Sequence, residues 1–458
     1  MNAHAERLRE IHTTLASLTS SPYSHDVIEL ALATATSLPV CAGEHPAPVW
    51  LLIAGAPSSG KTEGVLLLKG APNVTYLDAM TENSFVSGYV DKKTGEGPPQ
   101  QLLSDLHGKC LIVKDLTTIF SMRDDRVRKI LGDFQSIYDG EYAKATGTLG
   151  LKSYQSTFAM IGCITPLALH KHHTYMSMVG GRFLVIRLLP LTDQEREAGF
   201  ERAWDEEARR QKLPQLRKLL MEHVESLLKE PVAMEPETAE QREQLNKLAL
   251  LLARGRGVIL TEKVQELDEG TGEERYAYET ANVQIEEPYR ALEQLKNLGR
   301  ALARIHGRSQ VTDHEMELLR RVVLSSVSPT RGDALACFRR YPTGLTAKEL
   351  ARELKKSETR ARGLLQELVA LKLVVEDKGS AGWIYRPIPE LADLINEKVR
   401  VLDHRDDLSE EKPDAQNSPP TNLPIALGAP TPVVTFVCGP GAFQGCYSPP
   451  ANETTGPS

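Results

Sequence analysis

The chain has 458 residues, of which 41% are hydrophobic and 25% are charged, and its formal net charge is −7. This length exceeds one ordinary hydrophobic core, so two or three domains are expected, and the composition excludes a wholly disordered or fibrous chain. A mildly acidic total does not exclude a nucleic-acid partner, because the local distribution of charge decides that contact.

The cysteines and the N-terminal residues argue against several further classes of protein. Six cysteines are scattered without a Cys-x-x-Cys pair, which argues against a zinc module and against a disulfide framework, so no zinc is expected. The first residues, MNAHAERLREIHTTL, are polar and helical in character rather than typical of a signal peptide. No apolar run is long enough to cross a membrane, and a cytoplasmic protein without membrane contact is expected.

The first half of the chain predicts an α/β fold. Residues 1–46 predict a small helical lead-in, and residues 47–192 predict a parallel sheet flanked by helices. The reason is that short, continuous apolar runs, typical of strands buried on both faces, alternate with helical stretches. These runs are Pro48–Ala54, Val74–Leu77, Cys110–Val113, Phe158–Ile164 and Phe183–Leu189.

A phosphate-binding motif follows the first apolar run. The sequence GAPSSGKT at Gly55–Thr62 fits the pattern GxxxxGK[ST], in which glycines let successive backbone N–H groups face phosphates. Lys61 would reach the β- and γ-phosphates, and the Thr62 hydroxyl would hold Mg²⁺. We therefore expect ATP and Mg²⁺ as cofactors. The residues expected to bind them are Gly55, Ala56, Pro57, Ser58, Ser59, Gly60, Lys61, Thr62 and Glu63.

An acidic residue ends the third apolar run, where a P-loop protein needs a carboxylate for the magnesium shell. The candidate is Asp115, which follows Lys114 where an Asp-Glu pair is usual. Asp115 could hold the metal shell, in which case an adjacent glutamate base is missing, or it could occupy the position of that base. A solvated charge at a strand end is the structural alternative, and Asp139 or Glu141 could supply a base from elsewhere.

The order of the motifs resembles that of minichromosome maintenance helicases. Residues 85–119, FVSGYVDKKTGEGPPQQLLSDLHGKCLIVKDLTTI, resemble that family's hairpin insertion and acidic strand. Residues 138–166, YDGEYAKATGTLGLKSYQSTFAMIGCITP, resemble its pre-sensor hairpin and sensor strand. The segments 180–183, GGRF, and 290–293, RALE, resemble its SRF and sensor-helix motifs. The resemblance covers about 85–325. It implies a diverged AAA+ ATPase from a mobile element or phage, assembled as a homo-oligomeric ring, expected to be a hexamer.

The resemblance also implies catalytic roles. Thr165 falls at the position of the sensor-strand asparagine and would align the attacking water, although it could be an ordinary strand-end threonine. Arg182 would be the arginine finger offered to a neighbouring subunit, with a surface arginine as the alternative. Arg290 would be the lid sensor, an assignment left open because its helix is rich in arginine.

Four lysines are candidates for DNA contact in the presumed hairpins. Lys144 and Lys152 lie in the second hairpin, and Lys92 and Lys93 lie in the first. In a ring such lysines would line the pore and contact phosphates. Solvated hairpin charges are the alternative.

The second half of the chain predicts a helical lid and a winged helix. Residues 193–328 are expected to be a helical lid or linker, interrupted by a polar stretch with Gly270 and Gly272. Residues 329–390 predict a winged-helix domain, because two amphipathic helices are followed by a strand, a glycine turn and a strand. Ser357 is a good N-cap for the second helix, whose expected core positions are Leu364, Leu365, Leu368 and Leu371. Residues 391–458 are expected to form a helical end and a disordered tail rich in Pro, Asn, Ser, Thr and Gly.

The winged helix has its own candidate contacts. Residues 331–388 carry a net charge of roughly +5, which favours contact with phosphates. Thr359, Arg360 and Arg362 lie at the start of the second helix of the pair, and Lys378 lies in the wing. Winged helices also serve as protein-binding modules, so that alternative remains open.

Three functions are compatible with these features. The first is an AAA+ ATPase motor that acts on DNA as a helicase or translocase. The second is a DNA-bound regulatory switch that binds ATP and rarely hydrolyses it, which the Lys114-Asp115 pair favours. The third is an AAA+ remodeller of a protein partner, with the winged helix as an adaptor.

Overall fold

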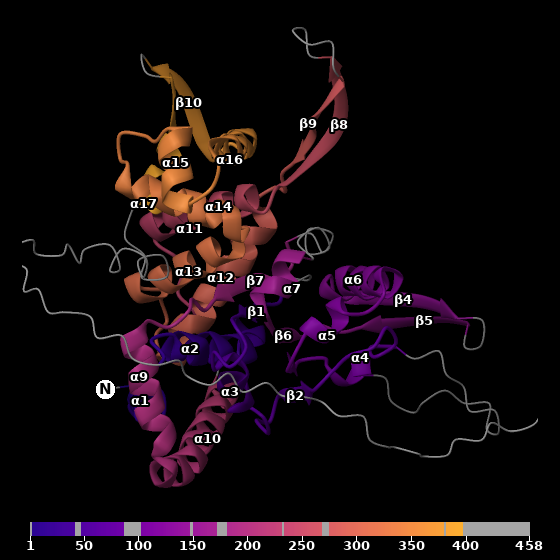
Figure 1. Cartoon of the computed structure of the whole chain (residues 1–458). Coiled ribbons are helices and arrows are strands. Elements are labelled where there is room, and N and C mark those ends of the chain that lie inside the picture. The colour runs from indigo at the N-terminus through magenta and orange to yellow at the C-terminus, as the bar shows by residue number, and fades with distance from the viewer. Residues whose placement is uncertain are drawn as a thin grey trace, which may run out of the picture. The chain divides into compact units, whose positions relative to one another are not determined.

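The computed structural model describes most of the chain up to residue 396 (Figure 1). The predicted contacts Lys92 and Lys93 and the predicted tail from residue 397 onward lie outside the described residues. Among the residues described, no helix is both long and apolar enough to span a membrane. The described residues are 2–41, 47–86, 102–146, 150–171, 181–230, 233–267, 274–379 and 382–396.

A five-stranded sheet forms the centre of the first half of the chain. All of its pairings are parallel, in the order β2-β3-β6-β1-β7, which confirms the predicted parallel sheet. The strands fall on the five predicted apolar runs. Their bounds are β1 Trp50–Ala54, β2 Val74–Leu77, β3 Cys110–Val113, β6 Ala159–Ile164 and β7 Leu184–Arg187.

The two faces of this sheet belong to two hydrophobic cores. Along β1, Leu51 and Ile53 lie in one core, whereas Trp50, Leu52 and Ala54 lie in the other. Successive side chains of a strand point to opposite faces, so a strand between two cores must be apolar at every position. This explains why the sequence shows continuous apolar runs rather than alternation.

The N-terminal helices belong to the body of the protein. The helix α1 spans Ala3–Ala16, and α2 spans Ser24–Ala35. Every residue of α2 from Val27 to Ala35 is buried, and the helix contacts β1, β6, α3 and α12. The expected lead-in is therefore a layer over one face of the sheet.

Shorter elements connect the strands. One of them is the predicted second hairpin, in which β4 and β5 pair antiparallel. The bounds are η1 Leu38–Val40, α3 Lys61–Leu66, α4 Leu102–Asp105, α5 Thr117–Phe120, α6 Asp124–Tyr138, β4 Glu141–Thr146, β5 Gly150–Gln155 and α7 Pro166–Lys171.

The region expected to be a helical lid contains a hairpin as well as helices. The strands β8, Val258–Leu267, and β9, Glu274–Gln284, pair antiparallel with an irregularity between Leu260 and Thr261. The sequence predicted helices interrupted by a polar stretch, and the structure adds that the residues on either side of this stretch form strands. The helices are α9 Asp193–Trp204, α10 Glu206–Lys229, α11 Ala239–Gly255, α12 Tyr289–Ile305 and α13 Asp313–Ser326.

A winged helix follows these helices, as predicted. The wing β10–β11 pairs antiparallel, and an isolated bridge joins Leu345 to Tyr385. Ser357 caps α16 by accepting a hydrogen bond from the Arg360 N–H, as its sequence position predicted. The bounds are α14 Pro329–Cys337, η2 Phe338–Arg340, α15 Ala347–Leu354, α16 Glu358–Ala370, β10 Val374–Gly379, β11 Gly382–Pro387 and α17 Pro389–Asn396.

Candidate nucleotide site and nucleic-acid interface

The GAPSSGKT segment forms a tight loop at the carboxyl end of β1. The Gly55 N–H donates to the Ile164 carbonyl at 3.1 Å, and the Ser59 N–H donates to the Ala56 carbonyl at 3.2 Å. Ser58 and Gly60 have positive φ angles of 61° and 81°. A left-handed residue is unstrained at a glycine and costs free energy at a serine, so the loop stores some strain at Ser58.

Lys61 lies inside this loop. Its Nζ donates to the Ala56 carbonyl at 3.0 Å, and the side chain is buried. A neighbouring thiol on β6, Cys163, is influenced electrostatically by Lys61 and Asp115 and hydrogen-bonds Thr62. Burial raises the pKa of Cys163 to about 12, so the thiol stays protonated. Lys61 and Thr62 follow β1 and Asp115 follows β3, and the parallel pairing of both strands with β6 puts these residues at the same end of the sheet.

The predicted acid and sensor residues lie together beside the loop. Asp115 accepts a hydrogen bond from the Thr117 N–H at 2.8 Å, and the Thr165 N–H donates to the Thr117 hydroxyl at 3.4 Å. Lys114 is directed to a different partner, because its Nζ lies 3.7 Å from the Asp78 carboxylate at the end of β2. Asp115 is therefore the member of the pair that faces the loop.

A pocket of about 210 Å³ adjoins the loop. Its polar rim includes the Ser59 hydroxyl, which finds no hydrogen-bond partner in the part of the chain that the structure describes. Two arginines of α10 also line it, and one of them, Arg209, donates to Glu63 at 2.8 Å. Its apolar lining includes Tyr23, Val27, Leu188, Leu213 and Leu216.

Arg209 and the second arginine, Arg217, were missed by the sequence analysis. Both lie on the charged surface of α10, where no motif distinguishes them from their neighbours. Only the packing of α10 beside the loop brings them to the pocket.

Arg182 lies at the amino-terminal end of the parallel strands, opposite the end that carries the loop. It precedes β7, which runs parallel to β1, and its guanidinium donates to Asp139 at 2.9 Å and lies 5.6 Å from the ring of Tyr138. Tyr138 in turn contacts Trp50, the first residue of β1. A strand rises about 3.3 Å per residue, so the five residues of β1 separate this edge from the loop by roughly 16 Å.

This placement corrects two expectations. Asp139 cannot be the base for the loop of its own chain, because it lies at the far edge with Arg182. Arg182 is buried and paired rather than a surface arginine. To act as a finger, its guanidinium would first have to leave Asp139.

Arg290 lies at that far edge too. Its guanidinium is 4.0 Å from the Glu286 carboxylate, which also faces Arg256 at 3.6 Å. Burial is the largest influence on Glu286 and raises its pKa, against the effect of the two arginines. Arg256 donates to the Gly181 carbonyl at 2.8 Å, so Arg290 joins the surroundings of Arg182 and not those of its own chain's loop.

The other arginines of this region have internal partners. Arg300 donates to Glu237 at 2.7 and 2.9 Å, and Arg308 pairs with Glu315. Arg304 donates to the carbonyls of Thr36 and Glu230. Arg300, Arg304 and Arg308 are thus held by partners within the chain, and the assignment of Arg290 as the lid sensor stays a prediction.

The two candidate lysines of the second hairpin are cross-strand neighbours. The pairing of β4 with β5 places Lys144 opposite Lys152. Glu141, the other predicted source of a base, is the first residue of this hairpin and pairs with Gln155.

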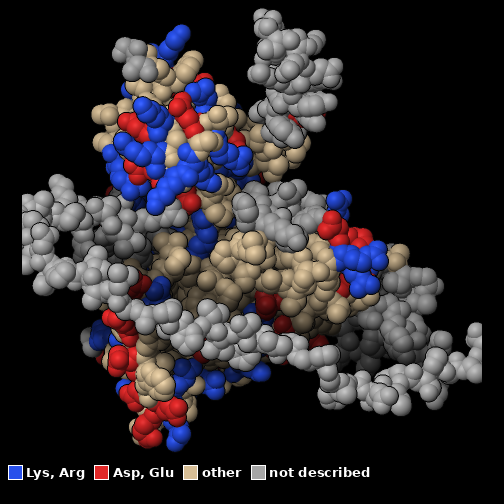
Figure 2. All heavy atoms as spheres, in the orientation of Figure 1, with Lys and Arg blue, Asp and Glu red and all other residues tan. Residues whose placement is uncertain are grey.

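The second helix of the winged helix presents an exposed polar face. Thr359, Arg360, Arg362, Gly363 and Gln366 are exposed, whereas the predicted core positions on the other face are buried. Arg362 donates to Glu358 at 2.9 Å, while no partner is found for Arg360 among the described residues. Figure 2 shows lysine and arginine side chains gathered over this domain.

The wing and the turn before this helix add further exposed groups. Lys378 pairs in register with Trp383, whose side chain is 49% exposed. Lys355 and Lys356 lie in the turn between α15 and α16 and are also exposed. These three residues, Trp383, Lys355 and Lys356, were not among the predicted contacts, although the Lys-Lys pair between two amphipathic helices was a usable signal.

The comparison with known families agrees with this geometry. Residues 332–378 match the model of the IclR helix-turn-helix domain. The chain carries a C-terminal winged-helix domain of the helix-turn-helix class. Helix-turn-helix domains read DNA by placing the second helix of the pair in the major groove. The match does not reach the GAPSSGKT loop, and no curated protein matches the chain.

Proposed function

We propose that this protein is an ATP-dependent DNA-binding protein, in which an AAA+ P-loop core binds and hydrolyses ATP and the winged helix contacts DNA. The observation that carries the proposal is the convergence of Lys61, Thr62 and Asp115 at the end of β1. In P-loop proteins these residue types hold the phosphates and the magnesium ion.

The pocket beside the loop supports ATP as the ligand. Its apolar lining suits a purine base, and it begins at Ser59 and Gly60, where the phosphates would end. Arg209 and Arg217 on its rim would contact phosphate or ribose oxygens of the same nucleotide. Thr165 would orient the attacking water from its place beside Thr117.

Arg182 and Arg290 lie at the end of the sheet opposite the loop, and this position supports a role between subunits for both. Neither can reach the nucleotide of its own chain across the sheet, so each would serve a neighbour's nucleotide in a ring. Arg182 would stabilise the charge that develops on the γ-phosphate, after exchanging Asp139 for that phosphate.

The winged helix supports DNA as the partner. Arg360, which has no partner among the described residues, the lysine turn and Lys378 of the wing together offer phosphate contacts around the helix that reads the groove. In a ring, Lys144 and Lys152 would add contacts to a strand in the pore. The protein would then be a motor that moves along DNA.

A regulatory switch is the second candidate, and the surroundings of Asp115 favour it. The carboxylate next to this strand end, Asp78, faces Lys114, and Asp139 lies at the far edge of the sheet. With no second acid placed as a base among the residues that the structure describes, hydrolysis would be slow, and bound ATP would set the state of the winged helix.

The experiment that tests the proposal is steady-state ATP hydrolysis with and without DNA, with Lys61→Ala as the blank. DNA-stimulated turnover that disappears in the variant supports the motor. Tight nucleotide binding without turnover supports the switch. Turnover that DNA does not stimulate supports a remodeller of a protein partner, and absence of nucleotide binding contradicts the proposal.

A further inference from the structure

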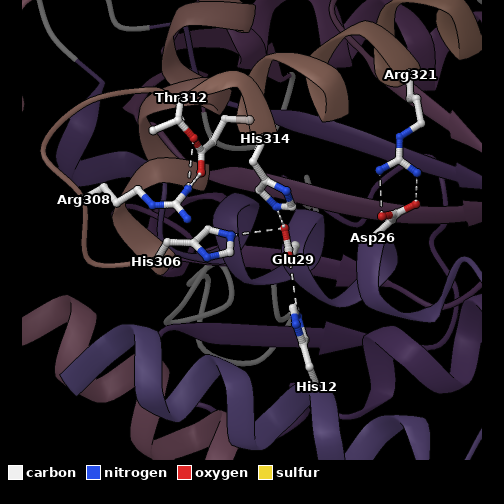
Figure 3. A network of polar contacts seen from close by, with 9 residues as sticks. His12, Asp26, Glu29, His306, Arg308, Thr312, His314 and Arg321 are labelled. Atoms are coloured by element: carbon white, nitrogen blue, oxygen red, sulfur yellow. Dashed lines mark hydrogen bonds and ion pairs between the residues drawn. The ribbon is translucent and has the colours of Figure 1, made fainter. Parts of the chain in front are cut away.

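Three histidines surround one buried carboxylate on the side of the protein where the N-terminal helices meet the lid helices (Figure 3). The carboxylate is Glu29 of α2, whose side chain is 5% exposed. His12 comes from α1, His306 follows α12, and His314 lies in α13. Two parts of the chain that are far apart in sequence, residues 12–29 and 306–314, therefore meet at one point.

The contacts have the geometry of a metal ligand set. The Nε2 atoms of His306 and His314 lie 3.3 and 3.0 Å from the same oxygen of Glu29, Oε2. The three ligand atoms all lie within 4.8 Å of one another. A tetrahedral zinc ion with ligands at about 2.0–2.1 Å holds neighbouring ligand atoms about 3.3 Å apart, which is close to these distances.

The charge balance of the cluster also favours an ion. A buried carboxylate needs a positive partner, and Glu29 pairs with imidazoles alone among the residues described. The two other nearby acids are already held by arginines, since Asp26 pairs with Arg321 and Glu315 pairs with Arg308 (Figure 3). A divalent cation between Glu29 and the histidines would place positive charge directly beside the buried carboxylate.

The third histidine, His12, would support the site from beside the carboxylate. His12 lies 3.3 Å from the other oxygen of Glu29, Oε1, and its ring stacks on His25 with centroids 4.6 Å apart. From there it would donate a hydrogen bond to the ligating carboxylate, the usual arrangement around protein metal sites. The side chain of His314 is 50% exposed, which gives an ion an entrance and leaves a coordination position for water.

We propose that Glu29, His306 and His314 bind one zinc ion, which fastens α2 to the ends of α12 and α13. This site is independent of the nucleotide site. It differs from the zinc modules that the sequence analysis excluded, because those are recognised by closely spaced cysteines. Here the ligands are separated by up to 285 residues, so that no spacing pattern exists.

The test is zinc titration of the full chain after treatment with a chelator, in excess Mg²⁺ and reductant. Competition with a chromophoric chelator gives the affinity and stoichiometry, and thermal unfolding gives the change in melting midpoint. We expect one zinc ion per chain, a midpoint several degrees higher with zinc, and a tetrahedral visible spectrum when Co²⁺ replaces it.

Three variants make the test specific. His314→Gln removes a half-exposed ligand, and Glu29→Gln removes the carboxylate. Both should weaken zinc binding at least tenfold and abolish the rise in midpoint. His107→Gln removes an exposed histidine elsewhere and should change neither the zinc affinity nor the rise in melting midpoint. Absence of zinc binding, or an equal stoichiometry and affinity in His314→Gln, overturns the proposal.

Discussion

Lys114 and Asp115 are adjacent in the chain, but their side chains face different partners. Lys114 lies by Asp78 at the end of β2, whereas Asp115 lies by Thr117 and the phosphate loop. In a strand successive side chains point to opposite sides, and the same alternation continues into the residues that follow β3. The unusual Lys-Asp pair therefore leaves one acid for the magnesium ion that we propose.

The first prediction concerns this pair. Asp115→Asn should lower ATP turnover at least a hundredfold while nucleotide binding changes little, because the variant loses the charge that holds the metal shell. Lys114→Ala, the control, should stay within about threefold of the wild type, since Lys114 forms an exposed ion pair. The measurement is steady-state turnover beside nucleotide binding by fluorescence. A stronger loss in Lys114→Ala would contradict the assignment.

The second prediction concerns Arg182. Arg182→Ala should bind nucleotide and lose turnover by about a thousandfold, as expected when an arginine finger is removed. Lys61→Ala should also lack ATP turnover, because its phosphate loop is defective. Mixing the two inactive variants should restore part of the activity, because some interfaces then join an intact loop to an intact Arg182.

The outcome of mixing decides whether the site is shared. Activity that stays absent in mixed rings, or an Arg182→Ala protein that hydrolyses ATP as a monomer, would rule out a role between subunits. Arg182 would then be a structural residue that holds Asp139 beside Tyr138.

The turn between α15 and α16 shows how a short element can favour function over stability. Lys355 ends α15 with a left-handed φ of 52°, and the Lys356 N–H donates to the Ala351 carbonyl at 2.9 Å. Glycine is the usual residue at such a helix end because it has no side chain to strain. Lys355 differs from other helix-end lysines in its position, because it lies exposed between the two helices of the helix-turn-helix, where a cation can contact a phosphate.

The third prediction follows from that turn. Lys355→Gly should raise stability by about 0.5–1 kcal/mol, because the strain of a left-handed lysine is removed. It should also weaken DNA binding, with a shallower dependence on salt, because a phosphate contact is lost. The measurements are thermal unfolding and fluorescence anisotropy at several salt concentrations.

A matched control exists at the other end of α16. Lys372 has a φ of 57° and the same type of turn, in which the Leu373 N–H donates to the Leu368 carbonyl at 2.9 Å. Lys372→Gly should give a similar gain in stability and leave DNA binding unchanged. An equal loss of DNA affinity in both variants would show that net charge, and not contact at the turn, governs binding.

At the scale of the whole molecule, buried polar side chains join segments that are distant in sequence. Arg304 of α12 is 1% exposed and donates to the Thr36 carbonyl after α2 and to the Glu230 carbonyl after α10, both at 3.1 Å. Burial lowers the pKa of Arg304, and the two carbonyls accept hydrogen bonds from the two terminal nitrogens of its guanidinium. This one side chain ties together three helices.

The fourth prediction tests that connection. Arg304→Met should lower stability by about 2–4 kcal/mol, because two buried carbonyls lose their donors while the apolar stem is kept. The control variant Arg210→Met, which removes an exposed arginine, should change stability by less than about 0.5 kcal/mol. The comparison of thermal midpoints checks this, and similar midpoints for the two variants would contradict it.

The sequence by itself determined the elements whose patterns are local. Continuous apolar runs predicted all five strands of the parallel sheet, because a strand between two cores has no polar face. Helix periodicity and the cap at Ser357 predicted the winged helix, because these signals act within a few residues. The phosphate loop remains a prediction from its motif, now with Lys61, Thr62 and Asp115 placed around it.

The tertiary structure decided what depends on distant segments. It placed Arg182, Arg290 and Asp139 at the edge of the sheet opposite the loop, and it brought Arg209 to the pocket. It also gathered His306 and His314 around Glu29. No local pattern encodes these contacts, because the packing of helices on a sheet, and not spacing along the chain, sets which side chains meet.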